Sequence, residues 1–336
     1  MEVVGVDLGF GWVKACSGDR AIRFPAVVGE GRQLFEREVG NADPLDCLVH
    51  HSGQFVGNLA IRQSNTKTYS LSEDRASHKV AGVLLDVAIE QLQVGVCGVV
   101  TGLPIGWYWG QRDGMERLAM AHPAVAQVKI VPQPLGSFMS WLLDDDGQVR
   151  HDRARYASGT VGIVDVGMHT ADYLLLQGME VSQPYSHTTR SGLHVALRTV
   201  GSGLPLYEAD QAVLSGSIDA REALQGLARQ VRGEIESFWP DTDMVLVTGG
   251  GGAMLYDYLG VGILADDPGM ANVEGYGKLG RRSWDADRVS IAGEGPGTDR
   301  GRAKDRTRGA VGSHQGGTTQ APSQLRWAVP SDEGRA

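Results

Sequence analysis

The chain has 336 residues, of which 42% are hydrophobic and 21% charged, and its formal net charge is −9. This composition is ordinary for a globular protein, and the negative charge argues against nucleic-acid binding by the chain as a whole. Three scattered cysteines, Cys16, Cys47 and Cys97, argue against a disulfide framework and against a zinc site. Neither a basic leader nor a long apolar run is seen, so we expect a cytoplasmic protein.

The first part of the chain is predicted to alternate strands and helices. Apolar patterning predicts strands at residues 3–8, 94–104 and 127–134, and helices at residues 76–92 and 135–143. Residues 21–30 and 53–64 are interpreted as strands or edges of a small insert, which we place at about residues 24–78.

A polar, turn-rich segment at residues 144–160 is interpreted as a linker or a surface loop. A second series follows it, with predicted strands at residues 160–167, 171–178 and 244–248, an amphipathic helix at 219–239 and a helix after the glycines at 249–252. The order predicts an α/β fold with two similar halves, residues 1–150 and 160–280.

Residues 283–336 are predicted to form a disordered tail. From Arg281 to the end the chain has ten Lys and Arg against seven Asp and Glu, and it is rich in Gly, Ser and Thr. Such a segment cannot bury enough apolar surface to offset the entropy of ordering it. A weak basic arm for DNA or a partner is the alternative interpretation, although so small a charge argues against strong DNA binding.

Two segments share an Asp-x-Gly turn after a buried strand: VDLGFGWVKA at residues 6–15 and VDVGMHTADY at residues 164–173. In the first, Gly9 and Gly11 allow the backbone to approach a ligand closely, and Lys14 offers a charge to phosphate oxygens. Asp7 ends a buried strand, where a carboxylate needs a partner such as a hydrated Mg²⁺.

The second turn repeats this design with Asp165, Gly167 and the hydroxyl of Thr170, so the two loops could hold a triphosphate from both sides. Asp172 stands at the position of Lys14. Three roles stay open for it: positioning the metal and its waters, orienting a loop, or pairing with a structural cation.

A third element, Thr248–Ala253, places four glycines between a strand and a helix. Bare backbone there could pack against a nucleoside and offer amides at a helix N-terminus. The Walker pattern is absent, and the first strand-turn unit lacks the dinucleotide-binding glycine pattern. The order and spacing of all three elements therefore carry the prediction.

VDLGFGWVKA resembles the first phosphate loop of the actin, Hsp70 and sugar-kinase superfamily, VDVGMHTADY its second phosphate loop and VLVTGGGGAM its adenosine loop. Within it, the chain most resembles bacterial and archaeal actin-like proteins of the ParM/StbA plasmid-segregation type. FPAVVGE and FVGNLAIRQS resemble their small outer subdomain, and IVPQPLGSF resembles the segment whose glutamine orients the attacking water. The resemblance covers about residues 1–280.

This resemblance implies an actin-like ATPase fold, with two ribonuclease-H-like lobes around a nucleotide cleft, and ATP and Mg²⁺ as cofactors. Asp7 and Asp165 would hold the metal through water, and Gln133, together with Asp165, would act in hydrolysis by positioning the water. The implied nucleotide contacts are Asp7, Gly9, Phe10, Gly11, Lys14, Gly167, Thr170, Asp172, Gly249, Gly250 and Gly251.

The sequence departs from many relatives at Met168 and His169, where they have glycine. Two bulky side chains there must point away from the phosphates or narrow the pocket. His169 is interpreted as a side chain packed beside the loop.

The leading hypothesis is an ATP-hydrolysing protein that forms head-to-tail filaments, used in plasmid or other DNA segregation through a separate DNA-binding adaptor. Direct contact with nucleic acid or a membrane is not expected. The alternatives are a non-filament ATPase of a chaperone-like or pilus-assembly kind and a small-molecule kinase on the same fold. The kinase would need a catalytic base for its acceptor, and no second substrate motif stands out.

Overall fold

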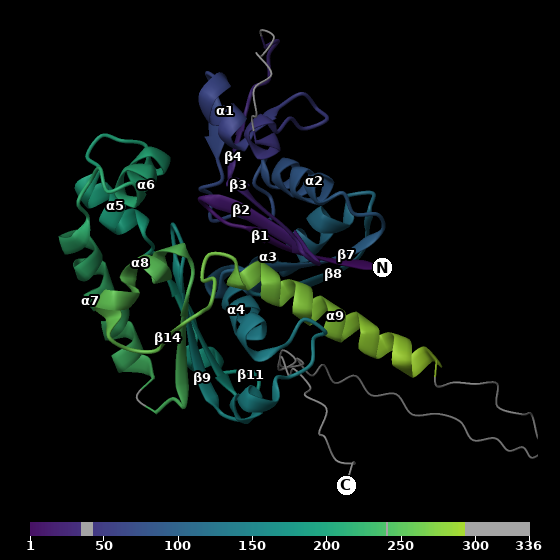
Figure 1. Ribbon diagram of the computed structural model, residues 1–336, viewed down its shortest axis with the longest axis vertical. Helices are drawn as coiled ribbons and strands as arrows, with labels where there is room; N and C mark the ends of the chain where they lie inside the picture. Colours follow the sequence, from purple (N-terminus) through teal and green to yellow (C-terminus); the bar gives the residue numbers. More distant parts are fainter. Residues whose placement is uncertain (35–42, 240, 293–336) are drawn as a thin grey trace, which may run out of the picture.

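Two sheets with the same strand order form the frame of the molecule (Figure 1). The computed structural model describes residues 1–34, 43–239 and 241–292, with side chains described as far as residue 284. The first sheet has the order β3 (Arg20–Pro25), β2 (Trp12–Ser17), β1 (Glu2–Leu8), β7 (Cys97–Leu103), β8 (Val125–Pro132). We call this sheet and its helices the first lobe.

The second sheet has the order β11 (Glu180–Val181), β10 (Ala171–Gln177), β9 (Thr160–Val166), β13 (Met244–Thr248), β14 (Ile263–Leu264), and β12 (His187–Thr189) also pairs with β10. In both sheets the strands of the opening hairpin are antiparallel and the later strands are parallel to the first. The predicted α/β fold with two similar halves is therefore confirmed.

Helices cover both faces of each sheet. The outer face of the first sheet is covered by α2 (Ala81–Leu92) and α3 (Ile105–Met120). On the second lobe, the outer layer contains α5 (His194–Val200), α6 (Leu206–Leu214), α7 (Arg221–Phe238) and α8 (Gly250–Leu259). Between the sheets lie α4 (Gln133–Leu142) and α9 (Ala271–Ala292), which share one apolar core with strands of both sheets (Figure 1).

The strand β1 shows how the sequence produces this layering. Val4 and Val6 are fully buried in the core beneath α2, as the period-two alternation of a strand requires. Gly5 faces the other way, and a Cβ there would lie only 2.2 Å from the carbonyl oxygen of Val273 in α9. The glycine lets α9 pack directly on the strand.

The insert differs from its prediction. It holds a three-stranded sheet, β5 (Phe55–Val56), β4 (Val27–Gly29) and β6 (Lys67–Tyr69), but most of residues 53–64 form the helix α1 (Gly57–Gln63). Gly57 ends the strand with a φ of 61°, and Leu59 and Ala60 are then buried against the small sheet. The short 3₁₀ helices η1 (Pro44–Cys47), η2 (His151–Ala157) and η3 (Gln183–Tyr185) lie in connections.

The predicted start of the tail at Ser283 was placed too early, because α9 continues to Ala292. Residues 293–336 lie outside the described residues. The first half of α9 is fixed by burial of Val273, Tyr276 and Leu279.

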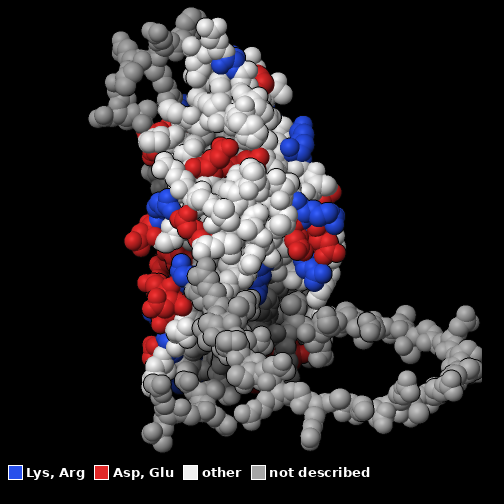
Figure 2. Space-filling model, turned by 90° about the vertical axis from the view of Figure 1, so that its right-hand side faces the viewer, with Lys and Arg blue, Asp and Glu red and all other residues white. Residues whose placement is uncertain are grey.

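Charged side chains lie in scattered groups on the face shown in Figure 2, some of them acidic and others mixed. These groups alternate with broad uncharged areas. Within the described residues, no helix combines the length and the apolar character needed to cross a membrane.

The crossing of α4 and α9 depends on glycine. A Cβ at Gly275 would lie 1.7 Å from the carbonyl oxygen of Gly136, so the two backbones touch there. We predict that Gly275→Ala destabilises the protein by about 1–3 kcal/mol through overpacking. Gly233→Ala, at an exposed site of α7 where an added Cβ meets nothing within 4 Å, is the matched control and should stabilise by about 0.5–1 kcal/mol. Chemical denaturation measures the free energy of unfolding of both variants. Equal changes in Gly275→Ala and Gly233→Ala would refute the close contact between α4 and α9.

Candidate functional site

A cleft of about 390 Å³ opens between the two lobes, and both Asp-x-Gly turns line it. Twelve predicted site residues lie on its walls: Asp7, Gly9, Phe10, Gly11, Lys14, Gln133, Asp165, Gly167, Thr170, Gly249, Gly250 and Gly251. Segments far apart in the sequence therefore meet as expected. Asp172 is the predicted site residue that is absent from this lining.

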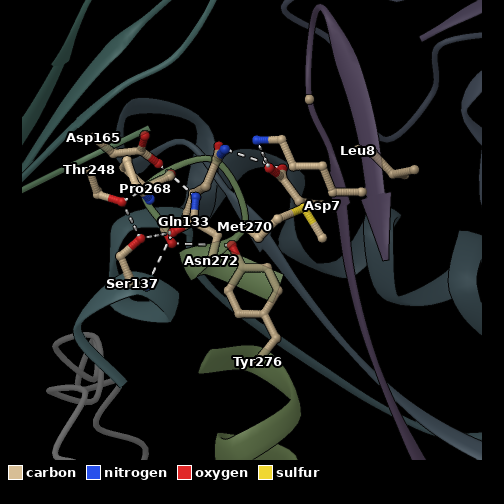
Figure 3. Close-up of polar contacts among 12 residues, drawn as sticks. Asp7, Leu8, Gln133, Ser137, Asp165, Thr248, Pro268, Met270, Asn272 and Tyr276 are labelled. Carbon is tan, nitrogen blue, oxygen red and sulfur yellow. Dashed lines mark hydrogen bonds and ion pairs between the residues drawn. The ribbon is translucent and has the colours of Figure 1, made fainter. Parts of the chain in front are cut away.

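Asp7 is held by two side chains from different elements (Figure 3). The residue is 2% exposed, and its carboxylate accepts a hydrogen bond from Nε2 of Gln133 at 3.2 Å and pairs with Nζ of Lys14 at 3.3 Å. Asp7 and Lys14 are direct cross-strand partners in β1 and β2, so the hairpin register itself creates the pair. Gln133, the first residue of α4, is further fixed by Tyr276, whose hydroxyl donates to its carbonyl oxygen.

Asp165 is held by a residue that the sequence analysis missed. Nδ2 of Asn272, near the start of α9, donates to Oδ2 of Asp165 at 2.7 Å, and Ser137 donates to Oδ1 of Asn272 from both its backbone nitrogen and its hydroxyl (Figure 3). The Ser137 hydroxyl also contacts that of Thr248 at 2.7 Å. Burial raises the pKa of Asp165 to about 6, while the hydrogen bond from Asn272 and the charge of Lys14 act against that rise.

Asp172 stands opposite Asp165 in the β9–β10 hairpin, the position that Lys14 has opposite Asp7. Its side chain accepts hydrogen bonds from the backbone nitrogen of Ile105 at 2.9 Å, from the Thr188 hydroxyl at 2.5 Å and from the Thr170 hydroxyl at 3.1 Å. Of the three roles left open for it, orientation of neighbouring segments fits these contacts. It joins the first turn of α3 in one lobe to β12 in the other.

Burial raises the pKa of Asp172 to about 7, and Asp165 opposite adds to the rise. The folded protein therefore binds a proton that the unfolded chain has released above about pH 4, and this group's contribution to stability falls as the pH rises towards 7. We predict that Asp172→Asn stabilises the protein by about 1–4 kcal/mol at pH 8 and by much less at pH 4. Thermal unfolding across pH measures the difference. The control variant Asp19→Asn changes an exposed residue and should show the same dependence of unfolding temperature on pH as the wild type. If Asp172→Asn also showed the wild-type dependence, the raised pKa of Asp172 would be contradicted.

Arg75 binds the backbone of the first Asp-x-Gly turn. The sequence analysis did not predict this role, because the residues around Arg75 are polar and form no recognisable motif. Its guanidinium donates to the carbonyl oxygens of Leu8 and Gly9 and, from the other side, to that of Ser70 at 2.8 Å. It also lies over the ring of Phe10, 4.3 Å from the centroid. Complete burial lowers the pKa of Arg75 to about 10, which leaves it charged at neutral pH. The residue thus links the insert to the turn that carries Gly9.

Met168 and His169 take different positions. Met168 lines the cleft, and its side chain packs against Gly11, so it narrows the space between the two turns. His169 is absent from the lining and packs between Phe10 and His194, with ring centroids 4.8 and 4.7 Å away. Its position agrees with the interpretation of His169 as a side chain packed beside the loop.

Two contacts join the second lobe to the insert. The guanidinium of Arg190 binds Glu73 through two bonds of 2.6 and 2.9 Å. The hydroxyl of Tyr207 in α6 donates to Oδ1 of Asn58 in α1 at 3.1 Å. Arg23, Asp210 and Asp267, which the sequence analysis did not single out, add charged groups to the cleft wall.

Gly249, at the third glycine-rich element, is required both by its backbone conformation and by the lack of room for a side chain. Gly249 has a φ of 84°, and a Cβ there would lie 2.3 Å from Oδ1 of Asp165. We predict that Gly249→Ala destabilises the protein by more than about 1 kcal/mol, since strain and displacement of Asp165 add together. Gly250→Ala, where an added Cβ meets nothing within 4 Å, should leave stability unchanged within about 0.5 kcal/mol. Denaturant titration compares the two, and a stable Gly249→Ala would contradict this geometry.

Comparison with known proteins agrees with this architecture. Residues 5–136 match the family model described as "Actin like proteins N terminal domain". No curated protein gave a significant sequence match. Among solved structures, the apo ParM protein of psk41 has a TM-score of 0.65 at 22% identity, over 86% of this chain and 99% of that one.

Two further structures show the same fold. A 15-stranded ParM filament from Clostridium botulinum has a TM-score of 0.63 at 18% identity, over 84% of this chain and 99% of that one. Ta0583, an archaeal actin homologue in complex with ADP, has a TM-score of 0.63 at 20% identity, over 84% and 100%. The fold is therefore that of the actin-like proteins. More particularly, residues 5–136 match the N-terminal domain model of actin-like proteins, in agreement with the resemblance seen in that part of the sequence.

Proposed function

We propose that this protein binds ATP with Mg²⁺ in the cleft, hydrolyses it and assembles head to tail into nucleotide-dependent filaments that segregate a plasmid or other DNA. The observation that carries the proposal is the meeting of both Asp-x-Gly turns, Gln133 and the glycines at 249–251 around one cleft. The similarity in fold to a ParM filament and to an ADP-bound actin homologue supports it.

The residues present fit a magnesium nucleotide. Asp7 and Asp165 are almost completely buried carboxylates in the cleft wall, and such groups need a cation or hydrogen bonds. They would hold Mg²⁺ through its waters, and the ion would supply charge neutralisation to the phosphates. Lys14 would bind phosphate oxygens, and the backbone at Gly9, Gly11 and Gly167 would approach them closely.

Gln133 would orient the attacking water, because its amide lies in the cleft and α4 fixes its position. In this structure its Nε2 donates to Asp7, which leaves Oε1 as an acceptor for a water proton. The first residues of α8 would face the nucleoside, where the lack of side chains at Gly249, Gly250 and Gly251 leaves room.

A head-to-tail filament needs two unlike faces on each subunit. The insert with α1 and β4 forms one end of the molecule in Figure 1, and β11 lies at the other end. There, a groove of about 920 Å³ runs between the start of α3 and the segment from β11 to β12, and Trp109 in it is 49% exposed. We propose this groove as the face that receives the next subunit.

The remaining parts of the proposal concern the cell. The protein would act in the cytoplasm and reach its DNA through a separate DNA-binding adaptor, without direct contact with nucleic acid or membrane. The mixed charge on the face of Figure 2 offers no continuous basic area, which supports the use of an adaptor.

The test is phosphate release with ATP and Mg²⁺ over a range of protein concentrations, with sedimentation of the same samples. We predict hydrolysis that begins above a threshold concentration together with pelleting. Gln133→Ala should slow hydrolysis by about 10²-fold while pelleting with ATP persists, because it removes water positioning and no assembly contact. Trp109→Glu should abolish pelleting and keep nucleotide binding.

Hydrolysis proportional to protein without pelleting would instead indicate a non-filament ATPase. Phosphate transfer only in the presence of an added alcohol or acid would indicate a small-molecule kinase. Absence of any nucleotide binding would refute the proposal as a whole.

A further inference from the structure

Outside the cleft, metal-ligating side chains gather where the turn at residues 49–54 meets α2. His50, His51 and Asp86 each place one ligand atom so that all three atoms lie within 4.8 Å of one another. Glu90 follows Asp86 by one helical turn and lies on the same face of α2. The four groups come from two segments that are far apart in the sequence.

Each imidazole faces its own carboxylate. Nε2 of His50 lies 3.2 Å from Oδ2 of Asp86, and Nδ1 of His51 lies 3.6 Å from Oε1 of Glu90. The two histidine rings are themselves only 3.8 Å apart between centroids. Two imidazoles and the Asp86 carboxylate therefore converge on one small volume, and Glu90 lies beside it, next to His51.

The backbone holds this arrangement in place. The turn is closed by bonds from the His50 nitrogen to the Gln54 carbonyl oxygen at 2.9 Å and from the Gly53 nitrogen to the His50 carbonyl oxygen at 2.7 Å. Gly53 has a φ of 84°, which the turn requires and glycine adopts without strain. Both histidines are thus presented on the α2 side of a defined turn.

A relay of side chains orients the His50 ring. Its Nδ1 lies 2.7 Å from the Ser52 hydroxyl, which in turn donates to Oε1 of Gln54 at 3.0 Å. The backbone nitrogen of Ser52 donates to this same Nδ1 at 3.3 Å, so Nδ1 is an acceptor and Nε2 carries the proton that it donates to Asp86. A bound metal ion would replace that proton on Nε2. Metal-binding histidines are oriented in this way by a partner on the other ring nitrogen.

We propose that His50, His51, Asp86 and Glu90 form a binding site for a zinc-type divalent transition-metal ion. Imidazole with carboxylate is a ligand set that suits Zn²⁺, whereas Mg²⁺ takes oxygen ligands. Bonds of about 2 Å place tetrahedral ligands about 3.3 Å apart. The ligand atoms of His50, His51 and Asp86 lie within 4.8 Å of one another, so small side-chain movements would bring them to an ion, with Glu90 as the fourth ligand. The side chains of His51 and Glu90 are 69% and 42% exposed, so both can adjust. The cysteine pattern could not reveal such a site, because it contains no cysteine.

The position of the site suggests what the ion does. Val49, just before the turn, forms a β-bridge with Phe55 of the small sheet, while α2 belongs to the first lobe. A bound ion would cross-link the insert to the lobe on which it rests. The ion would therefore stabilise the folded protein, independently of any nucleotide.

The experiment uses the full chain without a histidine tag and titrates it with Co²⁺, whose visible absorption reports tetrahedral nitrogen and oxygen ligands. We predict one Co²⁺ per chain, displacement by Zn²⁺ but not by Mg²⁺, and a rise in unfolding temperature with Zn²⁺. His51→Ala should weaken binding by at least about tenfold, since loss of even an outer partner costs 10–100-fold. His51 is largely exposed, so this variant keeps the core intact.

His151→Ala, which removes an exposed histidine in η2, is the matched control and should bind Co²⁺ like the wild type. Absence of the Co²⁺ bands and of the temperature shift would overturn the proposal. Equal loss of affinity in His51→Ala and His151→Ala would overturn it as well, because binding would then be non-specific.

Discussion

Two buried carboxylates, Asp7 and Asp165, are the constraint on which the rest of the cleft depends. A buried carboxylate needs partners to remain ionised, and each of the two takes one partner from a helix between the sheets. Gln133 at the start of α4 serves Asp7, and Asn272 near the start of α9 serves Asp165. Because Ser137 on α4 also holds Asn272, the helix crossing and the polar network require each other.

What could be predicted from the sequence was local. An apolar strand followed by Asp-x-Gly occurs twice, and the glycines, Lys14 and Thr170 lie within a few residues of each aspartate, so strand geometry brings them together. The duplicated order of elements predicted two similar lobes, and the shared strand order confirms them. Gln133 was identified through the resemblance of IVPQPLGSF to a family segment, and the structure places it at the start of α4, directly after β8.

What could not be predicted depends on contacts between distant segments. Arg75 lies 67 residues from Leu8, and Asn272 lies 107 residues from Asp165, with nothing in either neighbourhood to indicate a partner. The helix α9 was cut short because its last turns have the polar composition of a disordered segment, although its first turns hold it in the core. In the insert, the positive φ of Gly57 ends the strand β5 and allows α1 to begin. The hydrophobic pattern alone does not distinguish this helix from a longer strand.

The path of the chain between the lobes has a mechanical consequence. The backbone passes from the first lobe to the second once, after α4, and returns once, before α9, and these two helices touch at Gly136 and Gly275. A connection through only two segments would let one lobe rotate against the other about this helix pair, and the width of the cleft would change with that rotation. The pairs Arg190–Glu73 and Tyr207–Asn58, which join the second lobe to the insert, would be made or broken by the same movement.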